Sequence, residues 1–159
     1  MKIAIYPGSF DPITKGHLDV LETGAGIFDK VIISVSINPR KTCFLTVDER
    51  MELIKASVSH LPNVEVDSFE GLTVEYAKIK DAKIILRGLR AVSDFEYEMQ
   101  LSQANSALSS DIKTVFLITK PKYNFISSST VKEIILMSGD ITKFVPEPVN
   151  KYLNNRFAK

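Results

Sequence analysis

The sequence has little of what marks secreted, membrane-spanning or strongly charged proteins. Its single cysteine, Cys43, excludes an internal disulfide, and we assign it no role. No apolar run approaches the ~18 residues of a membrane helix, and Pro7 and Gly8 interrupt the first apolar run before it could form the core of a signal peptide. Basic and acidic residues nearly balance, 20 against 19. These absences predict a cytoplasmic protein that binds neither nucleic acid nor membranes.

What the chain does have is a regular alternation of apolar strands and amphipathic helices. Its 159 residues suit one domain, and no repeat or linker divides them, so we expect a single domain over 1–159. Strands are predicted at 2–6, 30–36, 64–69, 83–87 and 113–119, and helices at 15–28, 46–60, 73–80, 94–108, from 127–130 to 139, and 147–156. Such alternation indicates right-handed βαβ units. The expected fold is therefore an α/β, Rossmann-like, doubly wound parallel sheet of five strands in the order 3-2-1-4-5, with C-terminal helices.

Three helix starts are predicted from capping residues. Thr46 with Glu49, and Ser93 with Glu96, have the spacing of capping boxes. Thr73 follows a glycine and a leucine, and is expected to be the N-cap of the third helix.

The turn at residues 6–17 joins the first strand to the first helix. Two prolines, two glycines and a histidine crowd into it, and a helix N-terminus offers free N–H groups that suit phosphate. We therefore predict a phosphate-binding turn in which His17 contacts the phosphate. The helix start should lower the pKa of His17, so that a neutral ring donates one hydrogen bond. The alternative is a histidine packed in the core or bonded to a carbonyl, and the surrounding glycines favour the functional role.

Other polar residues follow the remaining strands. Lys41 follows the second strand, Thr73 the third, and Arg87 with Arg90 the fourth, while hydroxyl residues at 127–130 follow the fifth. All of them are expected at the carboxyl ends of the strands, where open α/β sheets bind ligands at the switch point, here between the first and fourth strands. Arginines that end a buried strand suit bidentate phosphate binding better than a surface salt bridge.

The role of Glu98 and of the serines stays open at this point. Glu98 either orients an arginine, accepts from a ribose hydroxyl, or is a solvated helix residue. One of the four hydroxyl residues at 127–130 is expected to cap a helix, and the others suit a second anion site. No GxxxxGK[ST] motif is present, and the Gly-Ala-Gly at 24–26 lacks the third glycine of a dinucleotide fingerprint.

Two motifs resemble a known family. The Pro-Gly-Ser-Phe-Asp-Pro-x-Thr-x-Gly-His turn at 7–17 resembles the T/HxGH signature of the nucleotidyltransferase superfamily. The Arg-Gly-Leu-Arg-Ala-Val-Ser-Asp-Phe-Glu-Tyr-Glu run at 87–98 and Ile-Ser-Ser-Ser at 126–129 resemble the phosphopantetheine adenylyltransferases. The resemblance implies transfer of AMP from ATP to 4′-phosphopantetheine, giving dephospho-coenzyme A and pyrophosphate. It also implies Mg²⁺, a homohexamer and feedback by coenzyme A.

The resemblance further assigns residues to the two substrates. For phosphopantetheine they are Ser9, Lys41, Thr73 and Arg87. For ATP they are Ser9, Phe10, His17, Gly88, Leu89, Arg90, Glu98, Tyr123, Asn124, Phe125, Ile126, Ser127, Ser128 and Ser129. His17, Lys41 and Arg90 are the candidate catalytic residues, with His17 stabilising the transition state.

The chemistry of this reaction needs no general base, because a phosphate monoester is already an anion. Catalysis would consist of positioning and of stabilising charge on the phosphoryl groups. The two substrates bring roughly six negative charges against the three positive charges of Lys41, Arg87 and Arg90. We therefore expect Mg²⁺ held mainly by phosphates and water, with no metal site made by the protein.

Two other functions remain open. The first is a related nucleotidyltransferase that uses nicotinate mononucleotide as acceptor or CTP as donor. The second is a non-catalytic sensor of adenine nucleotides. A structural alternative also remains: the apolar residues around the helix at 94–108 pack either against another subunit or between two layers of one chain.

Overall fold

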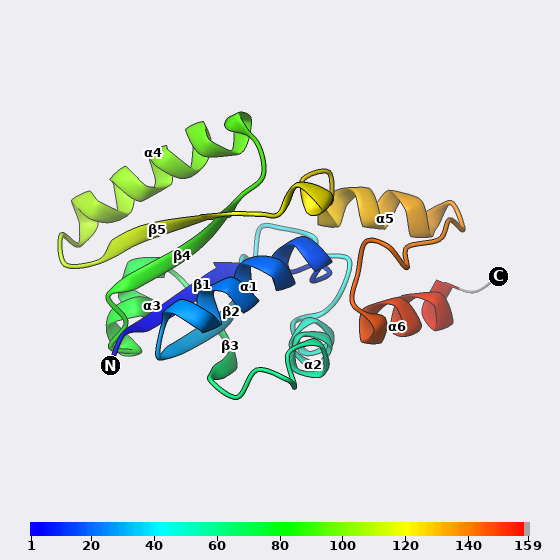
Figure 1. Ribbon diagram of the computed structural model, residues 1–159, viewed down its shortest axis with the longest axis horizontal. Coiled ribbons are helices and arrows are strands. Elements are labelled where there is room, and N and C mark those ends of the chain that lie inside the picture. The colour runs from blue at the N-terminus through cyan, green and yellow to red at the C-terminus, as the bar shows by residue number, and fades with distance from the viewer. Residues whose placement is uncertain (158–159) are drawn as a thin grey trace.

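The computed structural model describes residues 1–157. Five strands form one parallel sheet: β1 (Ile3–Gly8), β2 (Lys30–Ile37), β3 (Val64–Glu70), β4 (Ile84–Leu89) and β5 (Lys113–Ile118). Their order is β3-β2-β1-β4-β5 (Figure 1). This confirms the predicted sheet and its doubly wound topology. Residues 158–159 of the predicted domain lie outside the described residues.

The helices cover the two faces of this sheet (Figure 1). They are α1 (Lys15–Ile27), α2 (Val47–Ser57), α3 (Thr73–Ile79), α4 (Val92–Leu108), α5 (Ser128–Leu136) and α6 (Glu147–Phe157), with a 3₁₀ turn, η1, at Pro121–Tyr123. Alternate residues of β1 serve different cores, because side chains of a strand alternate between faces. Ala4 and Tyr6 pack in the core that includes α1, α2, α5 and α6, whereas Ile5 packs in the core that includes α3. No helix within residues 1–157 is long and apolar enough to cross a bilayer.

The pairing of β1 explains where a ligand site can form. β1 pairs with β2 along its whole length, from Ile3 to Gly8. With β4 it pairs only through Ala4 and Ile5. The carboxyl ends of β1 and β4 therefore part beyond Ile5, at the switch point that the sequence predicts.

Two of the predicted N-caps, Thr73 and Ser93, are wrong. α3 begins at Thr73 itself, with Leu72 as its N-cap and no side-chain capping bond. α4 begins at Val92 after the N-cap Ala91, again without a capping side chain. At α4 the start is displaced because Asp94 accepts hydrogen bonds from Arg90. The predicted Thr46–Glu49 capping box is confirmed, although α2 ends at Ser57 rather than near residue 60.

Helix α4 is the least buried helix of the fold. Of its residues only Glu98 is buried, while Phe95, Tyr97, Met99 and Leu108 are exposed. Burial between two layers of this chain is therefore excluded for these apolar residues, and α4 lies along β4 and β5 with its outer face uncovered (Figure 1).

Two glycines of α1 allow a matched test of how this helix packs on the sheet. A Cβ at Gly24 would lie 2.6 Å from Cδ2 of Leu86, which is fully buried, whereas a Cβ at Gly26 would meet nothing within 4 Å. We expect Gly24→Ala to lower the free energy of unfolding by about 1–3 kcal/mol through overpacking. Gly26→Ala should leave it unchanged or raise it by up to ~1 kcal/mol. Urea unfolding of both variants checks this, and equal stabilities would contradict it.

Candidate active site

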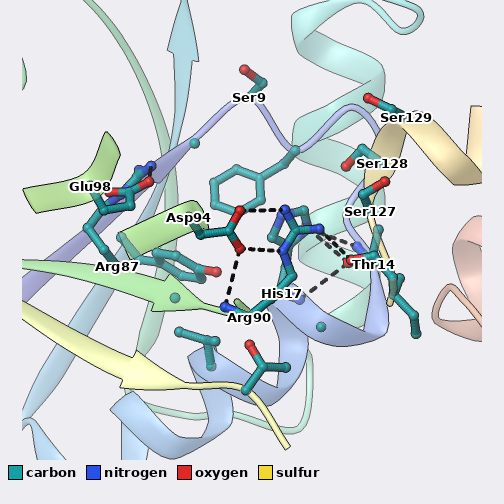
Figure 2. A pocket seen from close by; sticks show the side chains of 18 of the residues that line it. Ser9, Thr14, His17, Arg87, Arg90, Asp94, Glu98, Ser127, Ser128 and Ser129 are labelled. Atoms are coloured by element: carbon teal, nitrogen blue, oxygen red, sulfur yellow. Dashed lines mark hydrogen bonds and ion pairs between the residues drawn. The ribbon is translucent and has the colours of Figure 1, made fainter. Parts of the chain in front are cut away.

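A pocket of about 530 Å³ opens at the carboxyl ends of β1 and β4 (Figure 2). Its volume lies within the range of small-molecule sites. Its walls come from the turn at residues 7–17, the end of β4, the first turns of α4 and the start of α5. The predicted site residues that line it are Ser9, Phe10, His17, Arg87, Gly88, Arg90, Glu98, Ile126, Ser127, Ser128 and Ser129.

Six predicted site residues are not in the lining. They are Lys41, Thr73, Leu89, Tyr123, Asn124 and Phe125. Lys41 and Thr73 follow β2 and β3, which lie one and two strands away from β1, so they stand to the side of the pocket. Lys41 is exposed in the loop between β2 and α2.

The turn at residues 7–17 is held by an aromatic cluster. Phe10 has a φ of 45°, in the left-handed region, and is buried. Its ring meets Tyr6 and His17 edge-on, with centroid distances of 5.3 and 5.1 Å. A Cβ at Gly8 would lie 2.9 Å from the Phe10 ring. Gly8 is therefore needed because the ring of Phe10 packs directly on its backbone.

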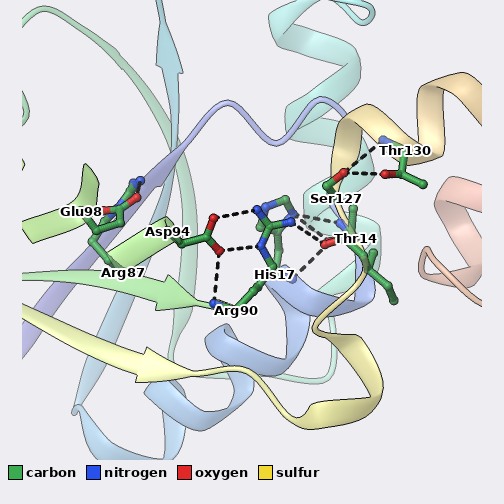
Figure 3. A network of polar contacts seen from close by, with 9 residues as sticks. Thr14, His17, Arg87, Arg90, Asp94, Glu98, Ser127 and Thr130 are labelled. Atoms are coloured by element: carbon green, nitrogen blue, oxygen red, sulfur yellow. Dashed lines mark hydrogen bonds and ion pairs between the residues drawn. The ribbon is translucent and has the colours of Figure 1, made fainter. Parts of the chain in front are cut away.

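His17 is fixed by a capping box at the start of α1 (Figure 3). The backbone N–H of Thr14 donates to His17 Nδ1 at 3.1 Å, and the backbone N–H of His17 donates to Thr14 Oγ1 at 3.3 Å. Because Nδ1 accepts a hydrogen bond, the neutral ring carries its proton on Nε2. Sequence reasoning did not show that Thr14 and His17 cap each other.

Burial lowers the pKa of His17 to about 4, and the positive charges of Arg90 and Arg87 act in the same direction. The predicted direction of the shift is confirmed. The predicted cause was the helix N-terminus, whereas the pKa is lowered by burial and by two guanidinium groups. His17 is therefore neutral near pH 7 and offers one N–H donor to the pocket it lines.

Arg87 is held by Glu98 in a bidentate ion pair, with Nε–Oε2 and Nη2–Oε1 distances of 2.7 and 2.5 Å. Its Nη1 donates to the backbone carbonyl of Pro7 at 2.6 Å. Burial favours the neutral guanidinium, but the Glu98 carboxylate outweighs it and raises the pKa of Arg87. Of the three roles considered for Glu98, orienting an arginine is the one that the geometry shows (Figure 2).

Arg90 joins the end of β4 to the segment before α5. Its Nε donates to Asp94 Oδ2 at 3.1 Å, and its Nη1 donates to the Ile126 carbonyl at 2.8 Å (Figure 3). Sequence reasoning missed Asp94, although its position four residues after Arg90 was a usable signal. Both arginines of the pocket are thus paired with carboxylates, so their charge is already partly balanced.

The serines at the start of α5 have different tasks. Ser127 is the N-cap, since Thr130 N donates to its hydroxyl at 3.1 Å. Ser128 donates its hydroxyl to the Pro12 carbonyl at 2.8 Å, which ties α5 to the turn at 7–17. The expected capping serine is confirmed, and a second hydroxyl is engaged in structure. Ser129 also lines the pocket.

Three buried charged residues near the pocket were missed. Asp11 and Asp19 accept backbone N–H groups of other loops, and Arg50 donates to the Ser9 carbonyl at 2.8 Å. All three are at most 5% exposed. Asp11 stands inside the motif at 7–17, so its place there was the available signal. Asp19 and Arg50 carry no sequence signal, because their partners are distant in the chain.

The residues present offer Mg²⁺ few ligands of their own. Within residues 1–157 there is no group of three or more histidine, cysteine or acidic side chains that could hold a metal ion. The two carboxylates in the pocket lining, Asp94 and Glu98, are both engaged by arginines. This donor set fits an ion coordinated mainly by substrate phosphates and water.

Comparisons with known proteins place the chain in a family. Residues 5–134 match the cytidylyltransferase-like family. A phosphopantetheine adenylyltransferase of Caldanaerobacter subterraneus is 50% identical over 100% of this chain and 99% of its own length. That of Nostoc punctiforme is 56% identical over 91% of this chain and 79% of its own.

A solved structure supports the fold independently. A Vibrio parahaemolyticus protein, provisionally described as a nicotinate-nucleotide adenylyltransferase, superposes with a TM-score of 0.77 at 22% identity. The match covers 99% of this chain and 94% of that one. At this identity the likeness concerns the fold, whereas the full-length relatives at about 50% identity define the narrower group. The chain therefore belongs to the phosphopantetheine adenylyltransferases of the cytidylyltransferase-like family.

Proposed function

We propose that this chain transfers AMP from ATP to the phosphate of 4′-phosphopantetheine, releasing pyrophosphate and forming dephospho-coenzyme A. The observation that carries the proposal is the meeting of three groups in one pocket. A neutral His17 with its proton on Nε2 lines the same cavity as Arg87 and Arg90. The names of the full-length relatives support the choice of substrates.

In the proposed reaction the acceptor phosphate attacks the α-phosphorus of ATP, and pyrophosphate leaves in line. A pKa of about 4 makes His17 a poor general base near pH 7. Its Nε2–H is instead suited to donate to the α-phosphoryl oxygens as negative charge develops there. The capping bond from Thr14 holds the ring in place before substrate arrives, so little reorganisation is required.

The arginines would bind phosphate while remaining held by their carboxylates. Glu98 fixes Arg87 through two of its nitrogens, and Asp94 fixes Arg90. Both pairs hold arginines that line the pocket, and Ser129 belongs to the same lining (Figure 2). Mg²⁺, held mainly by phosphates and water, would neutralise the remaining phosphate charge when bound.

The two substrates would lie side by side along the carboxyl ends of the strands. In this proposal Ser9, Lys41, Thr73 and Arg87 serve phosphopantetheine. ATP lies toward His17, Arg90 and the segment 123–129. Because Lys41 and Thr73 follow β2 and β3, the acceptor would reach from the pocket toward that side of the sheet.

Three further properties belong to the proposal: a cytoplasmic location, a homohexamer and feedback by coenzyme A. Helix α4 would form a subunit contact of the hexamer, and its exposed apolar residues, among them Phe95, Tyr97 and Leu108, support this. Coenzyme A contains the phosphopantetheine and adenine groups of the two substrates, so it would compete for the same pocket.

The decisive experiment measures pyrophosphate release by the purified protein. ATP with 4′-phosphopantetheine should give steady turnover, whereas replacing the acceptor by nicotinate mononucleotide, or ATP by CTP, should not. Turnover with a replacement in preference to the proposed pair would assign the chain to a related transferase. Binding of ATP without pyrophosphate release in any mixture would instead indicate a sensor.

His17→Ala should lower turnover by about 10²–10³-fold, as expected for loss of a preorganised donor to a developing charge. Steady-state pyrophosphate release measures the effect. His60→Ala is the matched control, since His60 is exposed and pairs with Glu22 away from the pocket lining. Near-normal turnover of the His17 variant would remove this residue from the mechanism.

Lys41→Ala should weaken the binding of phosphopantetheine more than the binding of ATP. The reason is that Lys41 follows β2, on the side assigned to the acceptor. Calorimetric titration with each substrate alone measures the two affinities. Lys30→Ala, which removes a lysine paired with Glu65 at the start of β2, is the control and should change neither. Equal losses for both substrates in the Lys41 variant would contradict the assignment.

The low pKa of His17 also predicts a pH dependence of stability. The folded value is about 4 against 6.5 for the ordinary group, so the unfolded chain binds the proton more tightly. The contribution of His17 to the free energy of unfolding is complete above pH 6.5. It is lost as pH falls toward 4, by a total on the order of 2–3 kcal/mol. The free energies of unfolding of the wild type and of His17→Asn, compared between pH 7 and 4, isolate this contribution.

A stability difference between the two proteins that does not shrink as pH falls would contradict the shifted pKa. An NMR titration of the His17 ring gives the midpoint directly. It should lie near 4 rather than near 6.5.

A further inference from the structure

Two buried aspartates stand beside the pocket without lining it. Asp11 is 5% exposed and Asp19 is 4% exposed. In the chain they flank the Thr14–His17 capping box, one on each side. A buried carboxylate is unfavourable unless its oxygens are hydrogen-bonded, so their partners show what these residues hold in place.

Asp11 fixes the loop that carries Lys41. Its Oδ2 accepts from Phe44 N at 2.7 Å, and its Oδ1 accepts from Leu45 N at 2.8 Å. Lys132 of α5 lies 3.6 Å from Oδ2. The other end of the loop is the end of β2 at Ile37, which pairs with β3. Asp11 therefore determines where residues 38–43 lie relative to the turn at 7–17.

Asp19 holds a different segment, through one backbone N–H and one ion pair. Its Oδ2 accepts from Lys120 N at 2.9 Å, and its Oδ1 lies 2.7 Å from Lys120 Nζ. Lys120 begins the segment 120–126 after β5, which includes η1. The far end of this segment is held by Arg90, which donates to the Ile126 carbonyl. Asp19 therefore sets the near end of a segment whose far end lines the pocket.

We propose that Asp11 and Asp19 are positioning residues with separate tasks. Asp11 acts on the acceptor side through the Lys41 loop, and Asp19 acts on the nucleotide side through residues 120–126. The inference rests on the proposed function, because that function assigns the two loops to the two substrates. The tasks are separable because the carboxylates share no hydrogen-bond partner and contact different loops.

The test uses Asp11→Asn and Asp19→Asn in the full-length protein. The amide keeps the shape and one acceptor oxygen but loses the charge and the second acceptor. Asp29→Asn is the matched control, since Asp29 also accepts a distant backbone N–H, from Lys2 at 2.6 Å, but lies before β2 at the opposite end of the sheet.

Calorimetric titrations with ATP alone and with 4′-phosphopantetheine alone give the expected pattern. Asp11→Asn should weaken the binding of phosphopantetheine about tenfold and change the affinity for ATP by less than about twofold. Asp19→Asn should show the reverse pattern. The Asp29 variant should change neither. A general loss of structure would weaken the binding of both substrates, so equal losses of affinity for the two substrates in either variant overturn the proposal.

Amide hydrogen exchange separates positioning from simple stabilisation. Exchange should accelerate at Phe44 and Leu45 in Asp11→Asn, and at Lys120 in Asp19→Asn. Faster exchange without the split in affinities overturns the proposal. If a variant does not fold, the wild type still provides a test: phosphopantetheine alone should slow exchange at Phe44 and Leu45, and ATP alone at Lys120. Equal slowing of both loops by either substrate would overturn it.

Pyrophosphate release by the wild type distinguishes the two levels of failure. If the wild type does not turn over ATP with phosphopantetheine, the proposed function is wrong and the positioning roles fall with it. If the wild type is active but the variants show no reciprocal split, the reaction stands and the positioning roles alone are refuted.

Discussion

The parting of β1 and β4 is the constraint on which the site depends. The two strands pair only through Ala4 and Ile5, so their carboxyl ends leave backbone groups facing a gap. Arg87 spans that gap by donating to the Pro7 carbonyl. A side chain thus takes the place of ladder hydrogen bonds at the switch point. The guanidinium satisfies a backbone carbonyl at the point where the strands part, so it lies at the switch point before any phosphate binds.

A site for anions built from partly buried arginines faces a second constraint. An unpaired buried guanidinium is costly, and Glu98 and Asp94 remove that cost for Arg87 and Arg90. The ion pairs reduce the positive potential of the pocket, so the two arginines alone do not neutralise the charge of the substrates. A neutral His17 fits this arrangement, because burial and the positive charges of Arg90 and Arg87 all disfavour a protonated ring and lower its pKa.

Much of the fold followed from the sequence, because strand–helix alternation with apolar strands admits few topologies. Arg87 and Arg90 were placed correctly because a buried strand leaves its last residues one open direction. Lys41 and Thr73 also follow strands, yet they lie outside the pocket lining, because β2 and β3 stand on the side of β1 away from β4. The predicted cap at Ser93 is wrong because α4 begins two residues earlier than expected, at Val92, where Asp94 accepts hydrogen bonds from Arg90.

The contacts that assemble the site mostly join a side chain to another segment's backbone. Arg87 reaches the Pro7 carbonyl, Arg90 the Ile126 carbonyl, and Ser128 the Pro12 carbonyl. A backbone acceptor is present whatever residue stands at that position. The loops can therefore change their own side chains without moving, whereas loss of a donor releases a whole segment. Sensitivity to substitution should thus concentrate in the few side chains that hold backbone, more than in the residues of the loops they hold.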